Sequence, residues 1–143
     1  MSIQELDNLV KIGKLKVEPG TRAEFDGLVT LGKNRLTDAR NEDLSTDSQF
    51  DLAYNASHSF ALAALRQKGY RSEDRYVVFQ VLPHTLGLDA AVTRVFAKAH
   101  NERNLAEYQG RADIDGQLLA DLVRCAAQLE KAVAALKPPA VEL

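Results

Sequence analysis

A run of small residues in the middle of the chain limits its fold more than any other feature. Alanine and serine are dense between residues 50 and 67, where neither glycine nor proline occurs. Such a stretch favours a helix, and its small side chains let neighbouring helix axes approach closely. Residues 45–47 are all competent N-caps, and Gly69 is a suitable C-cap. We therefore predict a central helix that ends near Lys68 and is buried on more than one side.

Apolar residues elsewhere recur at helical spacing, and they predict five further helices. The expected ranges are residues 2–12, residues 19–39, residues 72–82, residues 87–107, and a last helix capped by Asp113 or Asp115 and running to Leu136. The second of these should bury a stripe made of Phe25, Leu28, Val29, Leu31, Leu36 and Ala39. Pro19 suits a first helical turn, whereas Pro83 should kink or end its helix. No sustained alternation of apolar and polar residues occurs, so strands are not expected. The expected fold is all-α, an antiparallel bundle of four or five helices.

Length and charge limit what this bundle can do. A chain of 143 residues suits one domain, residues 1–143. The formal net charge of −2 gives no general attraction to nucleic acid, so an RNA contact would need a local basic patch.

The same inventory bounds location and cofactors. Cys125 is the single cysteine, which excludes an intramolecular disulfide. The polar N-terminus does not resemble a signal peptide, and no apolar run approaches the roughly 18 residues of a membrane span. We expect a cytoplasmic protein without a membrane contact. Because His58, His84 and His100 lie far apart in the sequence, neither a metal site nor another cofactor is expected.

The end of the helix expected at residues 87–107 carries the first candidate site. Arg103 falls close to the apolar stripe, where a charge is costly unless it is paired. His100 and Asn104 are neighbours on the helix surface, as are Asn104 and Tyr108. Either Arg103 pairs with Glu107 or emerges at the edge of the bundle, or it serves a functional site.

A second candidate site lies in the central helix. Tyr54 and His58 are four residues apart and share a face, which Asn55 flanks. One interpretation is a buried Tyr and His, each hydrogen-bonded to a neighbouring helix. The other is a general base, since histidine titrates near neutral pH. Beyond this helix, the basic stretch 66–75 either contacts phosphates or forms a solvated corner between helices, and its acidic residues favour the corner.

Two of these segments resemble the HEPN-domain family. Residues 54–70, which begin Tyr-Asn-Ala-Ser-His and end Lys-Gly-Tyr, are similar to the central helix of that domain. Residues 103–108, Arg-Asn-Leu-Ala-Glu-Tyr, look like its Arg-Asn-x-Ala-Asp-Tyr signature. The resemblance covers roughly residues 47–136 and implies a bundle of four or five helices, usually paired into a homodimer.

The resemblance also implies a range of functions. Many HEPN proteins are RNases of toxin–antitoxin or defence systems, often encoded beside a minimal nucleotidyltransferase that would be the antitoxin partner. Others bind nucleotides or proteins without catalysis. The RNase motif is an Arg, a polar residue and a His four to six positions after the Arg. Arg103 and Asn104 match its first two positions, but Tyr108 and Gln109 stand where the His is expected.

Three hypotheses follow. In the first, the chain is a non-catalytic HEPN-like dimer that binds a nucleotide, RNA or protein, with Tyr54, Asn55, Glu107 and Tyr108 as binding residues. In the second, it is a metal-independent RNase toxin. Arg103 would then stabilise the charged phosphorane beside Asn104, and His100 or His58 would activate the ribose hydroxyl. In the third, it is a structural bundle without a ligand.

Overall fold

The computed structural model describes residues 3–110 and 114–140, and helices dominate this part of the chain. The elements are α1 (Gln4–Lys11), β1 (Lys16–Val17), α2 (Arg22–Ala39), α3 (Thr46–Gln67), β2 (Tyr70–Arg71), α4 (Arg75–Gln80), α5 (Leu82–Thr85), α6 (Ala90–Gln109) and α7 (Gly116–Ala134). The expected all-α class is confirmed.

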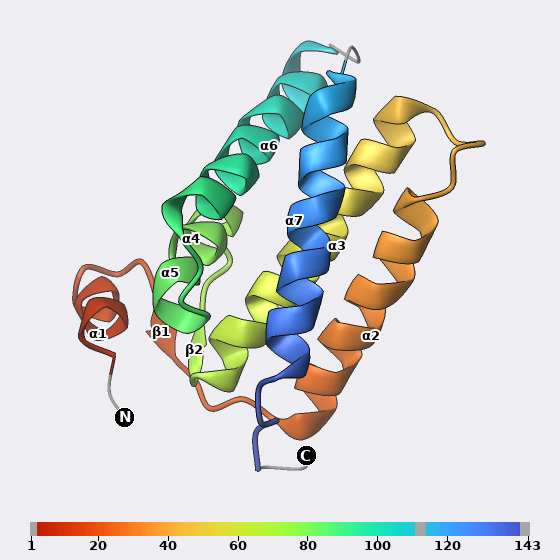
Figure 1. Cartoon of the computed structure of the whole chain (residues 1–143). Coiled ribbons are helices and arrows are strands. Elements are labelled where there is room, and N and C mark those ends of the chain that lie inside the picture. Colours follow the sequence, from red (N-terminus) through yellow and green to blue (C-terminus); the bar gives the residue numbers. More distant parts are fainter. Residues whose placement is uncertain (1–2, 111–113, 141–143) are drawn as a thin grey trace.

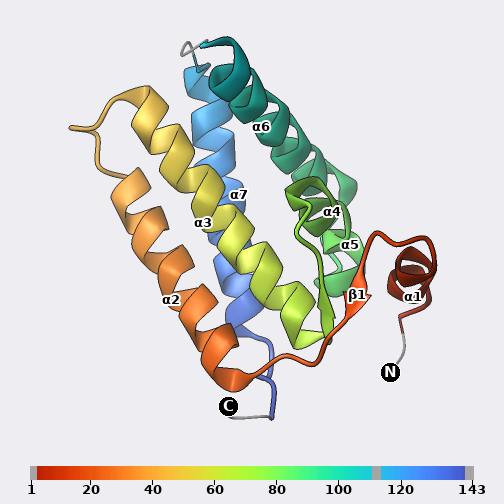
Figure 2. The ribbon, with the colours of Figure 1, turned by 180° about the vertical axis from the view of Figure 1, so that it is seen from behind.

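Four long helices form the body of the molecule. Figure 1 shows α7 in front of α3, with α2 and α6 on either side. From behind, in Figure 2, α3 lies in front, between α2 and the pair formed by α4 and α6. Of the residues in α3, twelve are buried, and they include Tyr54, Phe60 and Leu65. The prediction of a central helix buried on several sides is therefore confirmed.

Side-chain caps and glycines fix the ends of these helices. Ser45 Oγ accepts the backbone N–H of Ser48 at the start of α3, and Gly69 follows its end with φ +90°. Asp89 and Asp115 cap α6 and α7 in the same way. The cap at Asp115 confirms one of the two expected starts of the last helix, whereas α6 begins at Ala90, three residues after the expected start at residue 87. The expected helical Ser2 and the alternative cap Asp113 lie outside the described residues.

Three expectations about helix geometry are wrong. The second helix begins at Arg22 after an N-cap at Thr21, so Pro19 precedes it rather than opening it. Pro83 neither kinks nor ends α4, because α4 has already closed and Pro83 lies in the first turn of α5, where its missing N–H costs nothing. Leu31 is 45% exposed and does not belong to the buried stripe of α2.

The expectation that the chain has no strands is also wrong. β1 and β2 pair antiparallel, with Lys16 opposite Arg71 and Val17 opposite Tyr70. This ladder ties the segment before α2 to the segment after α3. Each strand has two residues, so the sequence contains no alternating pattern that would have revealed it.

A buried arginine reinforces the same junction. The Arg66 side chain is 3% exposed, and its Nε donates to Glu24 at 2.7 Å. Its terminal nitrogens donate to the backbone carbonyls of Glu18, Pro19 and Tyr70. We call Arg66 with these partners the arginine clasp. It corrects part of the sequence interpretation, since this end of the basic stretch is a buried anchor rather than a solvated corner.

Neighbouring residues complete the clasp. Arg71 donates to Glu18 and Glu24, so both carboxylates are shared between two guanidinium groups. A Cβ on Gly20 would stand 2.5 Å from the backbone carbonyl oxygen of Arg66, so only glycine allows this close approach.

The remaining features concern the core and the surface. Cys125 lies on the buried face of α7, where it is 1% exposed and carries a free thiol. Burial raises the pKa of that thiol. Within residues 3–110 and 114–140, none of the helices combines the length and the apolar character that a bilayer crossing needs.

Candidate functional site

Tyr54 lies at the centre of the polar cluster that α3 and α6 share. Its side chain is fully buried, and its hydroxyl is 2.9 Å from Nδ1 of His100 on α6. The ring packs against Phe79 of α4, with centroids 5.7 Å apart. Tyr54 therefore links three helices, and the interpretation of a buried side chain hydrogen-bonded to a neighbouring helix is confirmed for Tyr54.

Both ring nitrogens of His100 are engaged. Nδ1 contacts the Tyr54 hydroxyl, and Nε2 lies 3.2 Å from Nδ2 of Asn104, one turn further along α6. A neutral imidazole has one N–H and one lone pair, and the two contacts use both of them. Burial lowers the pKa of His100, and the charges of Arg103 and Arg75 add to this effect against the opposing charge of Asp74. His100 is thus a neutral connector with no free lone pair.

Two guanidinium groups lie over the Tyr54 ring. The central carbon of Arg103 is 5.1 Å from the ring centroid and that of Arg75 is 5.5 Å from it, a cation–π geometry worth about 0.5–2 kcal/mol each. Arg75 also donates to Oδ1 of Asn55 at 2.8 Å. The Nε of Arg103, in contrast, is buried without a hydrogen-bond partner. Burial raises the pKa of Tyr54, although the arginine charges oppose this shift.

His58 lies one turn after Tyr54 on α3 and meets the edge of Phe79, with ring centroids 6.1 Å apart. Its pKa falls to about 4, first because the ring is buried and then because Arg75, Arg35 and Arg103 surround it with positive charge. Arg35 reaches this place from α2 and donates to Ser59 Oγ at 3.1 Å.

Three arginines from three different helices thus converge on His58. We call Arg35, Arg75 and Arg103 the arginine triad. None of them belongs to an ion pair among the residues that the structure describes. Guanidinium groups gathered around one side chain without a carboxylate partner repel one another, and a phosphate or carboxylate bound among them would relieve the repulsion and accept their hydrogen bonds.

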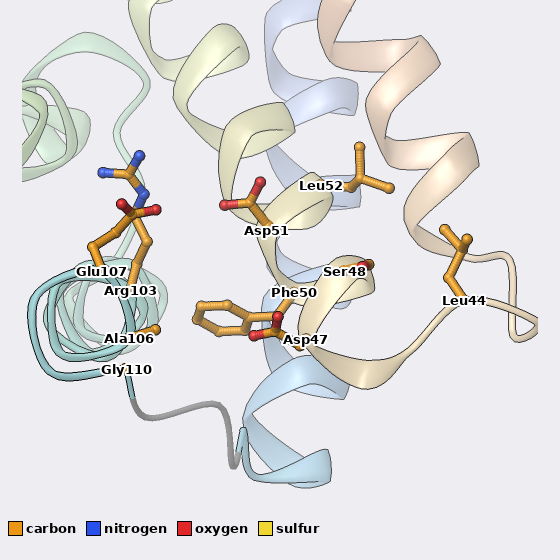
Figure 3. Close-up of a pocket in the computed structure, with 10 residues that line it drawn as sticks. All are labelled: Leu44, Asp47, Ser48, Phe50, Asp51, Leu52, Arg103, Ala106, Glu107 and Gly110. Atoms are coloured by element: carbon orange, nitrogen blue, oxygen red, sulfur yellow. The ribbon is translucent and has the colours of Figure 1, made fainter.

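A cleft of about 700 Å³ adjoins the triad (Figure 3). It lies between the first turns of α3 and the last turns of α6. The lining residues are Leu44, Asp47, Ser48, Phe50, Asp51, Leu52, Arg103, Ala106, Glu107 and Gly110. Arg103 belongs both to the cleft and to the triad, so the cleft reaches the triad at this residue.

The structure places most of the residues singled out from the sequence in this site. It brings together Tyr54, Asn55, His58, His100, Arg103 and Asn104. Glu107 lines the cleft, but the ion pair between Glu107 and Arg103, one of the alternatives that the sequence left open, is not formed among the described residues. Tyr108 is 86% exposed at the end of α6 and does not join the cluster.

Sequence reasoning missed Arg35, Arg75 and Phe79 as members of the site. Arg75 was assigned to the basic stretch, and nothing near Arg35 or Phe79 marks them in the sequence. All three reach the site through long-range packing of α2 and α4 on α3, which no local pattern encodes. In the described part of the chain, no group of three or more His, Cys, Asp or Glu side chains is placed to hold a metal ion.

Comparisons of the chain with protein-family models, with curated proteins and with solved structures give no match. The function must therefore be argued from the site itself.

Proposed function

We propose that this chain is a HEPN-like helical module that binds a phosphate-bearing ligand, a nucleotide or RNA, without cleaving it. The observation that carries the proposal is the arginine triad, three partly buried guanidinium groups around one neutral histidine that have no carboxylate partner within residues 3–110 and 114–140. A phosphate is the ligand whose charge and acceptor oxygens suit this arrangement best. The triad also supplies the local basic patch that a chain of net charge −2 needs for such a contact.

The geometry of the histidines favours binding over cleavage. A general base needs an accessible lone pair, and both nitrogens of His100 are already hydrogen-bonded. His58 keeps its lone pair at neutral pH, but a pKa of about 4 makes it a weak base. An RNase, the second candidate function, would therefore have to use His58 as its base and Arg103 as its cation.

A binding assay tests the proposal. Arg75→Ala and Arg103→Ala should each weaken the binding of 5′-mononucleotides and of a short single-stranded RNA by about tenfold or more, since a hydrogen bond to a charged group contributes about 1.5–3 kcal/mol. Arg94→Ala is the matched control, because Arg94 is exposed on α6, the helix that carries Arg103, and lies outside the site. Equal affinities for all four proteins would contradict the proposal.

The wild-type protein, Arg103→Ala and a further variant, His58→Ala, distinguish binding from cleavage. In buffer containing EDTA, the wild-type protein should leave the RNA intact. Cleavage that disappears in both Arg103→Ala and His58→Ala would establish the RNase instead, with His58 as the base.

We also propose that the module works as a homodimer beside a nucleotidyltransferase-type partner in a toxin–antitoxin or defence system. This part rests on the HEPN resemblance of residues 54–70 and 103–108. Light scattering at micromolar concentration should give twice the chain mass of 15.7 kDa, and a monomeric mass would remove the dimer from the proposal.

A further inference from the structure

The end of the bundle at which α3 begins and α6 ends is acidic. Residues 38–51 and residues 101–110 meet there (Figures 1 and 2), and together they carry seven acidic side chains against two arginines. None of the seven is in an ion pair within residues 3–110 and 114–140. We call these two segments the acidic end. Its formal charge of −5 is larger than the −2 of the whole chain, so the rest of the chain is net positive.

This charge separation sets the cleft apart from the arginine triad. The triad attracts anions, whereas carboxylates of the acidic end repel a polyanion over a Debye length of about 8–10 Å at physiological salt. Among the described residues that line the cleft, Arg103 is the one cation, and it stands against three carboxylates. A nucleic acid is therefore disfavoured in the cleft, and a positively charged ligand is favoured.

The cleft combines this charge with an apolar lining. Leu44, Leu52 and Ala106 are partly exposed along it, and the exposed side chains of Asp51 and Glu107 lie on its α3 and α6 walls (Figure 3). A volume of about 700 Å³ is enough for several side chains. Such a groove fits an amphipathic segment whose apolar side chains enter it while its lysines or arginines reach the carboxylates.

Tyr108 adds an exposed aromatic ring to the acidic end. It is 86% exposed, it follows Glu107 in the last turn of α6, and it takes no part in the cluster around Tyr54. Tyrosine is enriched in protein–protein interfaces, where a few aromatic side chains carry most of the binding energy. A ring left in water beside an apolar, acidic cleft favours a protein partner over a small cation.

From these observations we infer that the cleft and Tyr108 form a docking surface for a partner protein whose contact segment is basic and amphipathic. Asp51 and Glu107 pair with the lysines or arginines of that segment, the apolar lining takes its aliphatic side chains, and Tyr108 packs against it. The inference goes beyond the proposed function and does not rest on it, because none of these contacts needs a bound phosphate.

Peptide selection on the full chain tests the inference. A phage-displayed library of random peptides is panned on the immobilised wild-type protein, and enriched peptides are synthesised and measured by fluorescence anisotropy. We expect these peptides to share a positive net charge and several aliphatic or aromatic residues, and their affinity to fall as salt is raised. Acidic peptides, or no enrichment over an empty support, would overturn the inference.

Charge reversal places the peptide on the protein. The double variant Asp51→Lys and Glu107→Lys should weaken peptide binding by about tenfold or more. The matched control is Glu5→Lys with Asp26→Lys, which makes the same change in net charge at exposed residues outside the acidic end and should keep most of the affinity.

A second variant guards against a damaged fold. Tyr108→Ala removes an exposed ring that the core does not use, and it should also weaken peptide binding by about tenfold. Tyr108→Phe keeps the ring and should keep most of the affinity. Urea unfolding checks that each variant is folded.

The outcomes separate this inference from the proposed function. Peptide binding that neither the charge reversal nor Tyr108→Ala weakens would overturn the docking surface. A wild-type dimer that the charge reversal dissociates would assign the cleft to a second copy of the chain and overturn the basic partner. A wild-type protein that binds the peptides but no nucleotide or RNA would overturn the proposed function alone.

Discussion

At the scale of single residues, the surroundings of His58 make the stability of the protein depend on pH. The pKa of this side chain is about 4 in the folded chain, against about 6.5 in an unfolded one. The unfolded state therefore binds more protons between these values, and stability falls as the pH is lowered through this window.

The expected loss between pH 6.5 and pH 4 is up to about 3 kcal/mol, at about 1.4 kcal/mol per pKa unit. Urea unfolding at half-unit steps of pH measures it. His58→Gln removes this titrating group and should reduce the slope between pH 6.5 and pH 5, before the carboxylates titrate, and the slope that remains includes the contribution of His100, whose pKa is also lowered. An identical slope in this variant would show that His58 is not the group responsible.

Single residues also show how far the sequence leads. Arg103, His100 and Asn104 lie on one helix, so helical spacing alone predicts that they are neighbours. The contact between Tyr54 and His100 joins positions 46 residues apart, and no local pattern specifies it. The same holds for Arg75 over Tyr54, and the candidate site was therefore predicted in two halves that only the tertiary fold unites.

At the scale of elements, two glycines in α2 have opposite roles. A Cβ on Gly27 would meet no atom within 4 Å, whereas a Cβ on Gly32 would lie 2.6 Å from the ring of Phe60. Glycine costs a helix about 1 kcal/mol relative to alanine. At Gly27 this cost is not offset by any close packing, whereas Gly32 lets α2 pack closely on α3.

Gly27→Ala should stabilise the protein by up to about 1 kcal/mol, because only the helix propensity changes. Gly32→Ala should destabilise it by about 1–3 kcal/mol, the usual cost of overpacking a core. Thermal and urea unfolding of the two variants check both signs. A stabilising Gly32→Ala would contradict the close packing of Phe60 on α2.

How well the ends of the elements could be predicted depends on capping residues, glycines and prolines near them in the sequence. The start of α3 was predictable because Ser45 can cap it, and its end because Gly69 follows. Pro83 misled because proline is common both just after one helix ends and in the first turn of the next. β1 and β2 could not be predicted, since their pairing depends on the return of α3 to the segment before α2.

At the scale of the whole molecule, the arginine clasp joins the N-terminal segment to the bundle. Arg66→Met keeps the length and volume of the side chain but removes its hydrogen bonds to Glu24 and to three backbone carbonyls, while Arg71 still donates to Glu24. We expect it to destabilise the protein by about 2–3 kcal/mol, since such charge-assisted hydrogen bonds contribute about 1.5–3 kcal/mol and Glu18 and Glu24 remain partly hydrated.

The control is Arg124→Ala, which removes an exposed pair with Asp121. Pairs of this kind contribute about 0.2–1 kcal/mol, so the two variants should differ clearly in urea unfolding. A similar loss for both would mean that the clasp is no stronger than a surface ion pair. Binding by the arginine triad, at a separate place on α3, should persist in Arg66→Met.

The placement of Cys125 has a practical consequence for experiments on the cleft. This thiol is the single cysteine of the chain, it faces the core of α7, and the chain has no tryptophan. The native protein should therefore not react with maleimide reagents, and it has no tryptophan fluorescence. A cysteine introduced at Ser48, an exposed position on the cleft wall, would be the one site to accept a fluorophore. Its emission would then follow the cleft alone while nucleotides are titrated.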